Sequence, residues 1–206
     1  MERTHVAVLA SGRGSNFEAL ARACAGRGFP ARIVLLVTDN PEAGALKIAR
    51  AHRIDAVVVD CGHRPGSMSR GSSDEILRMC RDRGVDLICL AGFMRIVGGC
   101  LLEEFAGRMM NIHPALLPSF RGLHAQLQAI EYGVKVSGCT VHLVDPGVDT
   151  GPIVIQRAVP VLQDDTEDSL SERILAEEHA AYPEAVRLFA EGRIRLEGRK
   201  VLIKDA

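Results

Sequence analysis

The stretch HVAVLASGRGSNFEALARACA, residues 5–25, decides how this chain of 206 residues folds. Residues 5–10 form a short apolar run of the kind found in strands that are buried on both faces. Apolar residues then recur at helical spacing over 16–25, and the glycine- and serine-rich turn 11–16 lies between the two segments. We therefore predict a buried strand that runs through a tight turn into a helix.

The same alternation of apolar runs and amphipathic segments continues to about residue 92. The predicted strands are 31–39, 55–60 and 85–92, and the predicted helices are 42–52 and about 72–83, which follows a polar stretch at 61–73. Nearly continuous apolar strands are typical of parallel sheets that helices cover on both faces. We therefore predict an α/β fold, with a Rossmann-like, mostly parallel sheet flanked by helices on both faces.

The alternation is less regular after residue 93. The elements predicted there are a helix near 97–106, a strand at 108–113, an irregular segment at 114–123, a helix at about 124–133, strands at 137–144 and 153–161, a long helix at about 166–190 and a hairpin within 193–204. Tyr182 and Pro183 should interrupt or kink the long helix. We predict one domain, residues 1–206.

Composition and charge exclude several classes of protein. Hydrophobic residues make up 47% of the chain, which is ample for a core, and the formal net charge is −1. There is no dense basic run, so we expect no nucleic-acid partner. The apolar stretch at the N-terminus is too short for a signal peptide or a membrane span. The six cysteines form no C-x-x-C pair, as expected of free thiols in a cytoplasmic protein.

The turn SGRGSN, residues 11–16, suits an anion. Glycines allow the backbone to approach a ligand, and the free N–H groups at a helix start attract a phosphate. The turn is neither a Walker A motif nor a complete G-x-G-x-x-G, so it gives little support to ATP or NAD. The alternative is a tight turn in which Ser15 or Asn16 caps the helix.

Two polar side chains project from one face of the predicted strand 108–113. Asn111 and His113 are two residues apart and so point the same way, and Pro114 should end the strand directly after them. Open α/β sheets bind ligands at the carboxyl ends of their strands. The pair could therefore donate two hydrogen bonds to one developing oxyanion. The alternative is a structural histidine at a strand end.

Other polar residues could support this pair. The turn DPGVDTGP, residues 145–152, holds Asp145 and Asp149. One of these carboxylates could reach His113, raise its pKa and keep it protonated near neutrality; otherwise they are ordinary turn residues. His142 fits a core or supporting histidine better than a ligand.

The segment Glu177, Glu178 and His179 is most simply a solvated helix face. No two histidines have metal-ligand spacing, so we expect no metal.

Several stretches together resemble the phosphoribosylglycinamide formyltransferases, the folate-dependent glycinamide ribonucleotide transformylases of purine synthesis. These stretches are SGRGSN, LAGFMRIV, NIHPALLPSFRGLHA, GCTVHLVDPGVDTGPI and EEHAAYP. The resemblance runs over essentially the whole chain, and the glycine-rich first turn narrows it to the glycinamide ribonucleotide branch. It implies the formyltransferase fold, with a phosphate-binding half at about 1–92 and a folate-binding and catalytic half at about 93–206.

The resemblance also implies roles for individual residues. The implied catalytic residues are Asn111, His113 and Asp149. The residues implied for the ribonucleotide are Gly14, Ser15 and Asn16 at the phosphate, and Glu178 at the glycinamide. The residues implied for folate are Arg70, Met94, Arg95, Ile96, Val97, Asn111, Asp145, Pro146, Gly147, Val148 and Asp149. The placement of Arg70 needs a gap within 61–73, and Val97 stands where one common form of the motif has leucine.

The implied reaction moves the formyl group of 10-formyltetrahydrofolate, the co-substrate, to the amine of 5'-phosphoribosylglycinamide. The implied partners are these small molecules, with no metal, nucleic acid or membrane, for a monomer or homodimer. Formyltetrahydrofolate hydrolase is an alternative that we would expect to carry an N-terminal regulatory domain. Methionyl-tRNA formyltransferase would carry a C-terminal RNA-binding domain and a basic surface. A non-catalytic nucleotide-binding module would not need all three implied catalytic residues.

Overall fold

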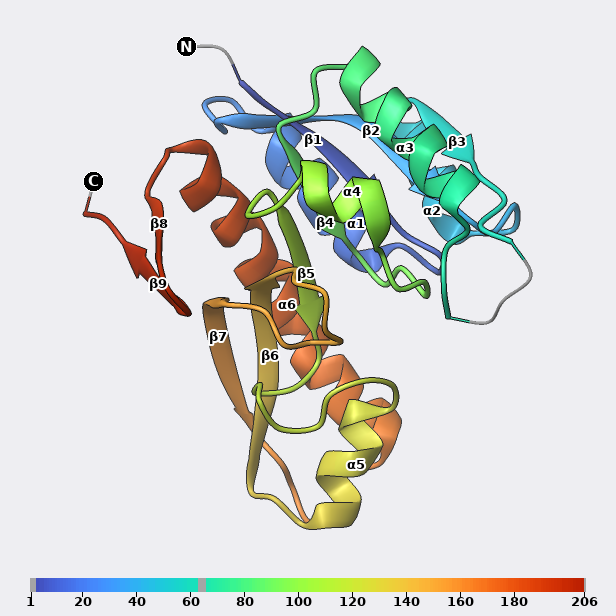
Figure 1. Cartoon of the computed structure of the whole chain (residues 1–206). Coiled ribbons are helices and arrows are strands. Elements are labelled where there is room, and N and C mark those ends of the chain that lie inside the picture. The colour runs from blue at the N-terminus through green and yellow to red at the C-terminus, as the bar shows by residue number, and fades with distance from the viewer. Residues whose placement is uncertain (1–2, 63–65, 206) are drawn as a thin grey trace. The chain divides into compact units, whose positions relative to one another are not determined.

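The computed structural model describes residues 3–62 and 66–205, and Figure 1 shows their helices and strands along the chain. Part of the predicted polar stretch at 61–73, namely 63–65, lies outside the described residues. The chain divides into two units, of which unit 1 ends at Met110 and unit 2 begins at Asn111. The predicted division near residue 92, between a phosphate-binding half and a catalytic half, stays a prediction.

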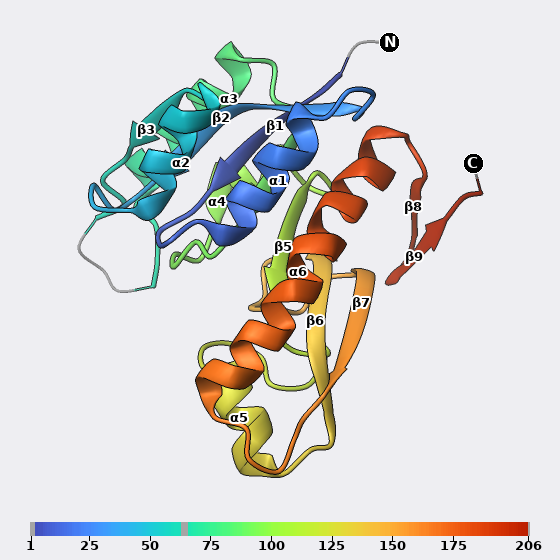
Figure 2. The same ribbon diagram turned by 180° about the vertical axis from the view of Figure 1, so that it is seen from behind.

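Unit 1 alternates strands and helices as predicted. Its elements are β1 (Thr4–Leu9), α1 (Ser15–Ala25), β2 (Ala31–Thr38), α2 (Gly44–His52), β3 (Ala56–Val58), α3 (Arg70–Asp82), β4 (Leu87–Leu90) and α4 (Gly99–Glu104). Strand β1 pairs in parallel with β2 and with β4, and β2 pairs in parallel with β3. Within this unit α3 and α4 lie on one face of the strands (Figure 1), and α1 and α2 lie on the other (Figure 2).

Unit 2 holds the remaining elements, and β5 (Met109–His113) crosses the unit boundary in the sequence. The others are α5 (Ala125–Tyr132), β6 (Val136–Leu143), β7 (Ile153–Pro160), α6 (Glu167–Ala190), β8 (Ile194–Glu197) and β9 (Lys200–Ile203). Strands β6 and β7 are antiparallel, and α6 packs against both. The strand order β3-β2-β1-β4-β5-β6-β7 confirms the predicted α/β class with a mostly parallel sheet. The predicted C-terminal hairpin is β8–β9.

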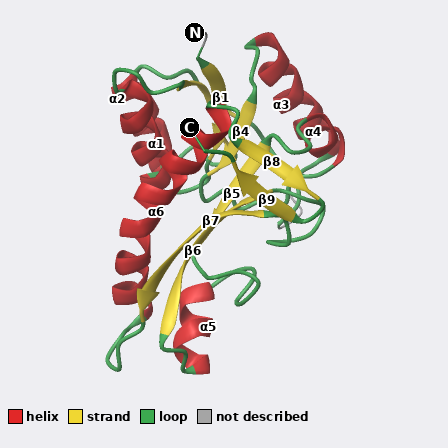
Figure 3. Cartoon of the chain, turned by 90° about the vertical axis from the view of Figure 1, so that its left-hand side faces the viewer, coloured by secondary structure: helices red, strands yellow, loops and turns green. Residues whose placement is uncertain are grey.

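Helix α6 runs through Pro183 without interruption, so the prediction that the helix would be interrupted there is wrong (Figure 3). Its start is fixed by a reciprocal capping box between Thr166 and Ser169. A proline removes one backbone hydrogen bond from a helix interior. The long row of buried side chains along α6, which includes Ile174 and Tyr182, offsets that loss because it packs against the sheet of unit 2.

None of the helices in the described ranges combines the length and the apolar character that a bilayer span requires.

The segment that follows β5 is fastened to β6 by one buried hydroxyl. Thr140 Oγ1 donates to the carbonyl oxygen of Ala115 at 2.6 Å and accepts from the amide of Leu117 at 3.1 Å. Gln156 Nε2 donates to the same hydroxyl at 3.0 Å and to the Leu117 carbonyl oxygen at 2.9 Å. Three of these bonds fix Ala115 and Leu117, shortly after His113, and the fourth holds the Thr140 hydroxyl in place.

We expect Thr140→Val to lower the free energy of unfolding by about 1–3 kcal/mol, because the shape is kept while buried backbone groups lose their partner. Urea unfolding measures the change. Ser137→Ala is the matched control in the same strand, since the buried Ser137 hydroxyl has no hydrogen-bond partner among the described residues. Equal effects of the two substitutions would contradict the role given to Thr140.

Candidate active site

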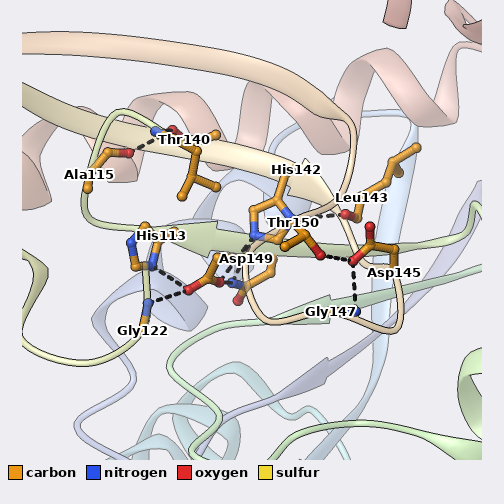
Figure 4. Close-up of polar contacts among 12 residues, drawn as sticks. His113, Ala115, Gly122, Thr140, His142, Leu143, Asp145, Gly147, Asp149 and Thr150 are labelled. Carbon is orange, nitrogen blue, oxygen red and sulfur yellow. Dashed lines mark hydrogen bonds and ion pairs between the residues drawn. The ribbon is translucent and has the colours of Figure 1, made fainter. Parts of the chain in front are cut away.

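Four side chains of unit 2 meet at the C-terminal end of β5. His113 Nδ1 lies 3.2 Å from Asp149 Oδ2, and the Asn111 amide nitrogen lies 3.3 Å from Asp149 Oδ1. The same amide nitrogen lies 3.2 Å from Nε2 of His142, a residue of β6. Figure 4 shows His113 and His142 on either side of Asp149. Asn111 and His113 come together because alternate residues of a strand share a face. The predicted contact between a carboxylate and His113 is confirmed for Asp149.

The loop between β6 and β7 holds Asp149 in a fixed conformation. Asp145 Oδ1 accepts from the Gly147 amide and from the Thr150 hydroxyl, which closes the turn that contains Asp149 (Figure 4). Asp149 itself has φ 51°, a left-handed conformation that aspartate tolerates better than most residues. Its Oδ2 also accepts from the Gly122 amide at 2.9 Å. The carboxylate is therefore held from both sides, and Asp145 supports the turn rather than reaching His113.

The charges of this cluster do not follow the prediction in full. Burial lowers the pKa of His113 below its ordinary value, and the Asp149 charge and the Phe120 carbonyl oppose that effect without cancelling it. Burial raises the pKa of Asp149, but contacts with His142, the Gly122 amide and His113 outweigh it and leave that pKa below its ordinary range. We predicted that a carboxylate would keep His113 protonated near neutrality. That prediction is wrong in its net direction, because desolvation of a buried imidazole disfavours the cation.

The lowered pKa of His113 predicts that acid destabilises the folded protein through this residue. An unfolded histidine titrates near 6.5. Between the folded-state pKa and that value the unfolded chain binds more protons, so the free energy of unfolding falls as the pH drops through this window and is unaffected above it. We expect His113→Asn to remove this part of the pH dependence, measured by urea unfolding at several pH values. The exposed histidine variant His124→Asn should keep it, and equal pH profiles of the wild type and His113→Asn would contradict the prediction.

Sequence reasoning missed several contacts of the cluster. The Phe120 carbonyl oxygen lies 2.8 Å from His113 Nε2, and the Gly122 amide binds Asp149. Both are backbone groups of the irregular segment 114–123, which carry no residue-specific signal. His142 is buried as predicted, with Nδ1 2.9 Å from the Leu143 carbonyl oxygen. Nε2 of the same ring faces Asn111 and Asp149.

The predicted phosphate turn lies in unit 1. Gly14, with φ 84°, is the N-cap of α1, so the alternative in which Ser15 or Asn16 caps the helix is wrong. A Cβ built on Gly14 would lie 2.9 Å from Cα of Ala45, so the close approach of the turn to α2 requires glycine here. A glycine cap also has no side chain that could occupy the amides of the first helical turn.

The residues implied for folate in unit 1 fall into two groups. Met94 and Ile96 are 59% and 53% exposed, whereas Val97 between them and α4 is buried. Arg70 is the first residue of α3 and is exposed. An open hollow of about 580 Å³ has Arg70 and Ile96 in its lining, together with Ser67, Met68, Ser73 and Glu103. Unit 1 therefore brings two of the implied residues to one hollow.

Glu178 does not lie on a solvated face, so that prediction is wrong for this residue. It is 6% exposed, on the side of α6 that packs against the sheet of unit 2. Burial, and then the nearby Glu178 carboxylate, raise the pKa of the Cys139 thiol to about 12. Glu177, one residue earlier, forms an ion pair with Arg157 at 3.3 Å.

Residues 3–62 and 66–205 contain no group of three or more His, Cys, Asp or Glu side chains that could hold a metal ion.

The chain is similar to known proteins over nearly all of its length. A family described as formyl transferase has a model that matches residues 4–186. The trifunctional purine biosynthetic protein adenosine-3 of Drosophila melanogaster is 46% identical over 192 residues, which are 92% of this chain but only 14% of that relative. Phosphoribosylglycinamide formyltransferase of Bacillus subtilis is 42% identical over 88% of this chain and 92% of its own. The crystal structure of glycinamide ribonucleotide transformylase 1 from Symbiobacterium toebii has a TM-score of 0.93 at 48% identity, covering 98% of this chain and 95% of that one.

Proposed function

The chain belongs to the formyl transferase family, and from that premise we propose that it transfers the formyl group of 10-formyltetrahydrofolate to the amine of 5'-phosphoribosylglycinamide. Relatives of similar length that are 42% and 44% identical bear the name of this activity. The observation in this chain that carries the proposal is the cluster of Asn111 and His113 around Asp149, with contacts of 3.2 and 3.3 Å. A turn that only binds nucleotide would not need a buried imidazole and carboxylate held together.

The proposed reaction develops a negative charge that the cluster of unit 2 can stabilise. The substrate amine attacks the formyl carbon, the bond from that carbon to the folate nitrogen breaks, and one proton passes from the amine to that nitrogen. After the amine has attacked and before the bond to the folate nitrogen breaks, the formyl oxygen carries a negative charge. The Asn111 amide and the His113 ring are N–H donors next to one another, and donors fixed before reaction stabilise such a charge most effectively.

His113 is suited to respond to that charge. Burial keeps its ring neutral in the free protein, while Asp149 lies 3.2 Å from Nδ1. An oxyanion near the ring would favour the imidazolium ion, and Asp149 would then stabilise the proton on Nδ1. We propose that His113 takes up the proton that the attacking amine loses, holds it while the oxyanion is present and gives it to the departing folate nitrogen, so that the ring ends neutral again, and that Asp149 orients the ring.

Unit 1 would supply binding groups for both small molecules. We propose that the ribonucleotide phosphate binds Gly14, Ser15 and Asn16, where a glycine cap leaves the amides of the first turn to an anion. We propose that the folate ring contacts the segment Met94–Val97, whose exposed apolar side chains suit an aromatic ligand. In unit 2, we propose that Glu178 contacts the glycinamide and that the loop 145–149 contacts the folate ring. Arg70 is proposed for the folate tail.

We propose a cytoplasmic enzyme with small-molecule partners, without nucleic acid, membrane or metal. The choice between monomer and homodimer stays a prediction.

The test is absorbance-monitored release of the folate product from a 10-formyl folate, with and without 5'-phosphoribosylglycinamide. We expect turnover only when the ribonucleotide is present, together with transfer of an isotopic label from the formyl group to the ribonucleotide. Turnover without the ribonucleotide would favour a hydrolase. The absence of turnover in both cases would favour a non-catalytic nucleotide-binding module and would contradict the proposal.

A further inference from the structure

Ser11 links the phosphate turn to the segment that leads into Met94–Val97, and both lie in unit 1. Its amide donates to the Gly92 carbonyl oxygen at 3.1 Å, and its Oγ accepts from the Met94 amide at 2.9 Å. Its own carbonyl oxygen accepts from Asn40 Nδ2 at 3.1 Å. Ser11 is buried, and its amide and its hydroxyl oxygen both bond to the segment 92–94.

A largely buried ion pair fastens the same segment from its next residue. Arg95 Nε lies 2.7 Å from Asp39 Oδ2, and the two side chains are 21% and 7% exposed. Arg95 Nη1 also donates to the Gly62 carbonyl oxygen at 3.4 Å. Burial raises the pKa of Asp39, but hydrogen bonds from Ser11 and Arg95 outweigh it and hold that pKa below its ordinary value. By geometry, the Asp39 carboxylate binds Arg95 through Oδ2.

Along the segment Met94–Val97, exposed side chains therefore alternate with side chains that are held against the protein. Met94 and Ile96 are more than half exposed, whereas Arg95 between them is drawn toward Asp39. The Ile96 amide donates to the Gly66 carbonyl oxygen at 2.8 Å, which fastens the other end. The ion pair of Arg95 and the hydrogen bonds donated by the Met94 and Ile96 amides fix which way Met94 and Ile96 face.

We propose that Asp39 is a positioning residue for the folate-binding segment: it holds Arg95 so that the backbone of Met94–Val97, which Ser11 fastens at Met94, is fixed before the ligand arrives. This inference rests on the proposed function of that segment. It assigns Arg95 an anchoring role, with its guanidinium engaged by Asp39. A segment that is ordered in advance loses less conformational freedom on binding, so loss of the anchor weakens affinity for the ligand of that segment alone.

The test compares Asp39→Asn with the wild type in steady-state kinetics that vary each substrate in turn. Asp39→Asn keeps the shape but removes the charge that Arg95 binds. We expect KM for the formyl folate to rise by about tenfold, since hydrogen bonds to charged groups are among the stronger ones. We expect kcat and KM for the ribonucleotide to change less than twofold. Glu104→Gln is the control, because it removes a carboxylate of unit 1 that pairs with Arg81 on the surface; all three constants should stay unchanged.

Two further measurements make the result decisive. Thermal unfolding of each variant shows whether it is folded, and Arg95→Lys, which keeps the charge but loses the planar fork, should raise KM for the formyl folate by an intermediate factor. If Asp39→Asn does not fold, that intermediate rise in Arg95→Lys carries the test. Unchanged KM for the formyl folate, or equal losses in kcat and both KM values, would overturn the positioning role. Absence of transfer by the wild type would overturn the proposed function and this inference with it.

Discussion

His113→Ala lowers turnover at least a hundredfold while the protein remains folded, and Asp149→Asn does the same. The expectation follows from the donor pair, because the loss of one preorganised donor to an oxyanion costs about 3 kcal/mol of transition-state stabilisation. The alanine variant loses the donor itself. The asparagine variant keeps the shape but removes the charge that lies 3.2 Å from His113 Nδ1. The measurement is the initial rate of ribonucleotide-dependent formyl transfer at saturating substrates.

The double variant sharpens this prediction. Because Asp149 acts on the reaction through His113, the combined substitution should cost about as much as His113→Ala alone rather than the product of the two effects. His124→Asn is the matched control, since His124 is an exposed histidine of unit 2 whose left-handed backbone asparagine tolerates. Near-normal turnover in either single variant, or full additivity in the double variant, would contradict the assigned roles.

The fold could be predicted because its buried strands are recognisable in the sequence as short runs of apolar residues. The strands of unit 1 that run through the core, such as β1 and β4, are buried along most of their length, and a run of apolar residues is the direct trace of that burial. The pairing of Asn111 with His113 was also predictable, because a period of two residues fixes which side chains of a strand share a face. Local pattern and tertiary structure agree in both cases.

The position of Glu178 shows where residue type misled the prediction. A Glu-Glu-His run reads as solvated, yet Ile174, Glu178, Ala181 and Ala185 are buried at spacings of three or four residues along α6. The helical period therefore marked Glu178 as part of the packed face. Chemical identity outweighed periodicity in the prediction, and burial of a carboxylate is an exception of the kind that functional sites contain.

The direction of the pKa shift of His113 could not be predicted from the sequence, for a different reason. The sign depends on the balance between desolvation, which lowers this pKa, and the Asp149 charge and the Phe120 carbonyl, which raise it. The Phe120 carbonyl and the Gly122 amide belong to the irregular segment 114–123 and carry no residue-specific signal. Proximity of the two residues was predictable, whereas the outcome of opposing electrostatic effects was not.

Gly151→Ala is expected to abolish most activity without touching any reacting group. A Cβ at this position would lie 1.7 Å from the carbonyl oxygen of Leu143 and 2.8 Å from its carbon, which no rotation of a side chain relieves. The Leu143 amide donates to the Pro152 carbonyl oxygen at 2.8 Å, so β6 and the loop are joined next to the clash. The loop must therefore shift, and Asp149 lies two residues before Gly151. Overpacking of this kind costs about 1–3 kcal/mol of folding stability.

The two effects of Gly151→Ala can be separated by measurement. Turnover should fall by about the same factor as in Asp149→Asn, at a temperature where circular dichroism and urea unfolding show the variant to be folded. Gly71→Ala is the control: a Cβ there meets no atom within 4 Å, and the residue lies in α3, where alanine is favoured over glycine. Loss of stability with wild-type turnover in Gly151→Ala would contradict the prediction, because it would show that the close packing at Gly151 does not determine the position of Asp149. A fall in turnover with nearly unchanged KM values for the substrates would show that Gly151 supports catalysis by allowing the Asp149 carboxylate to reach its position.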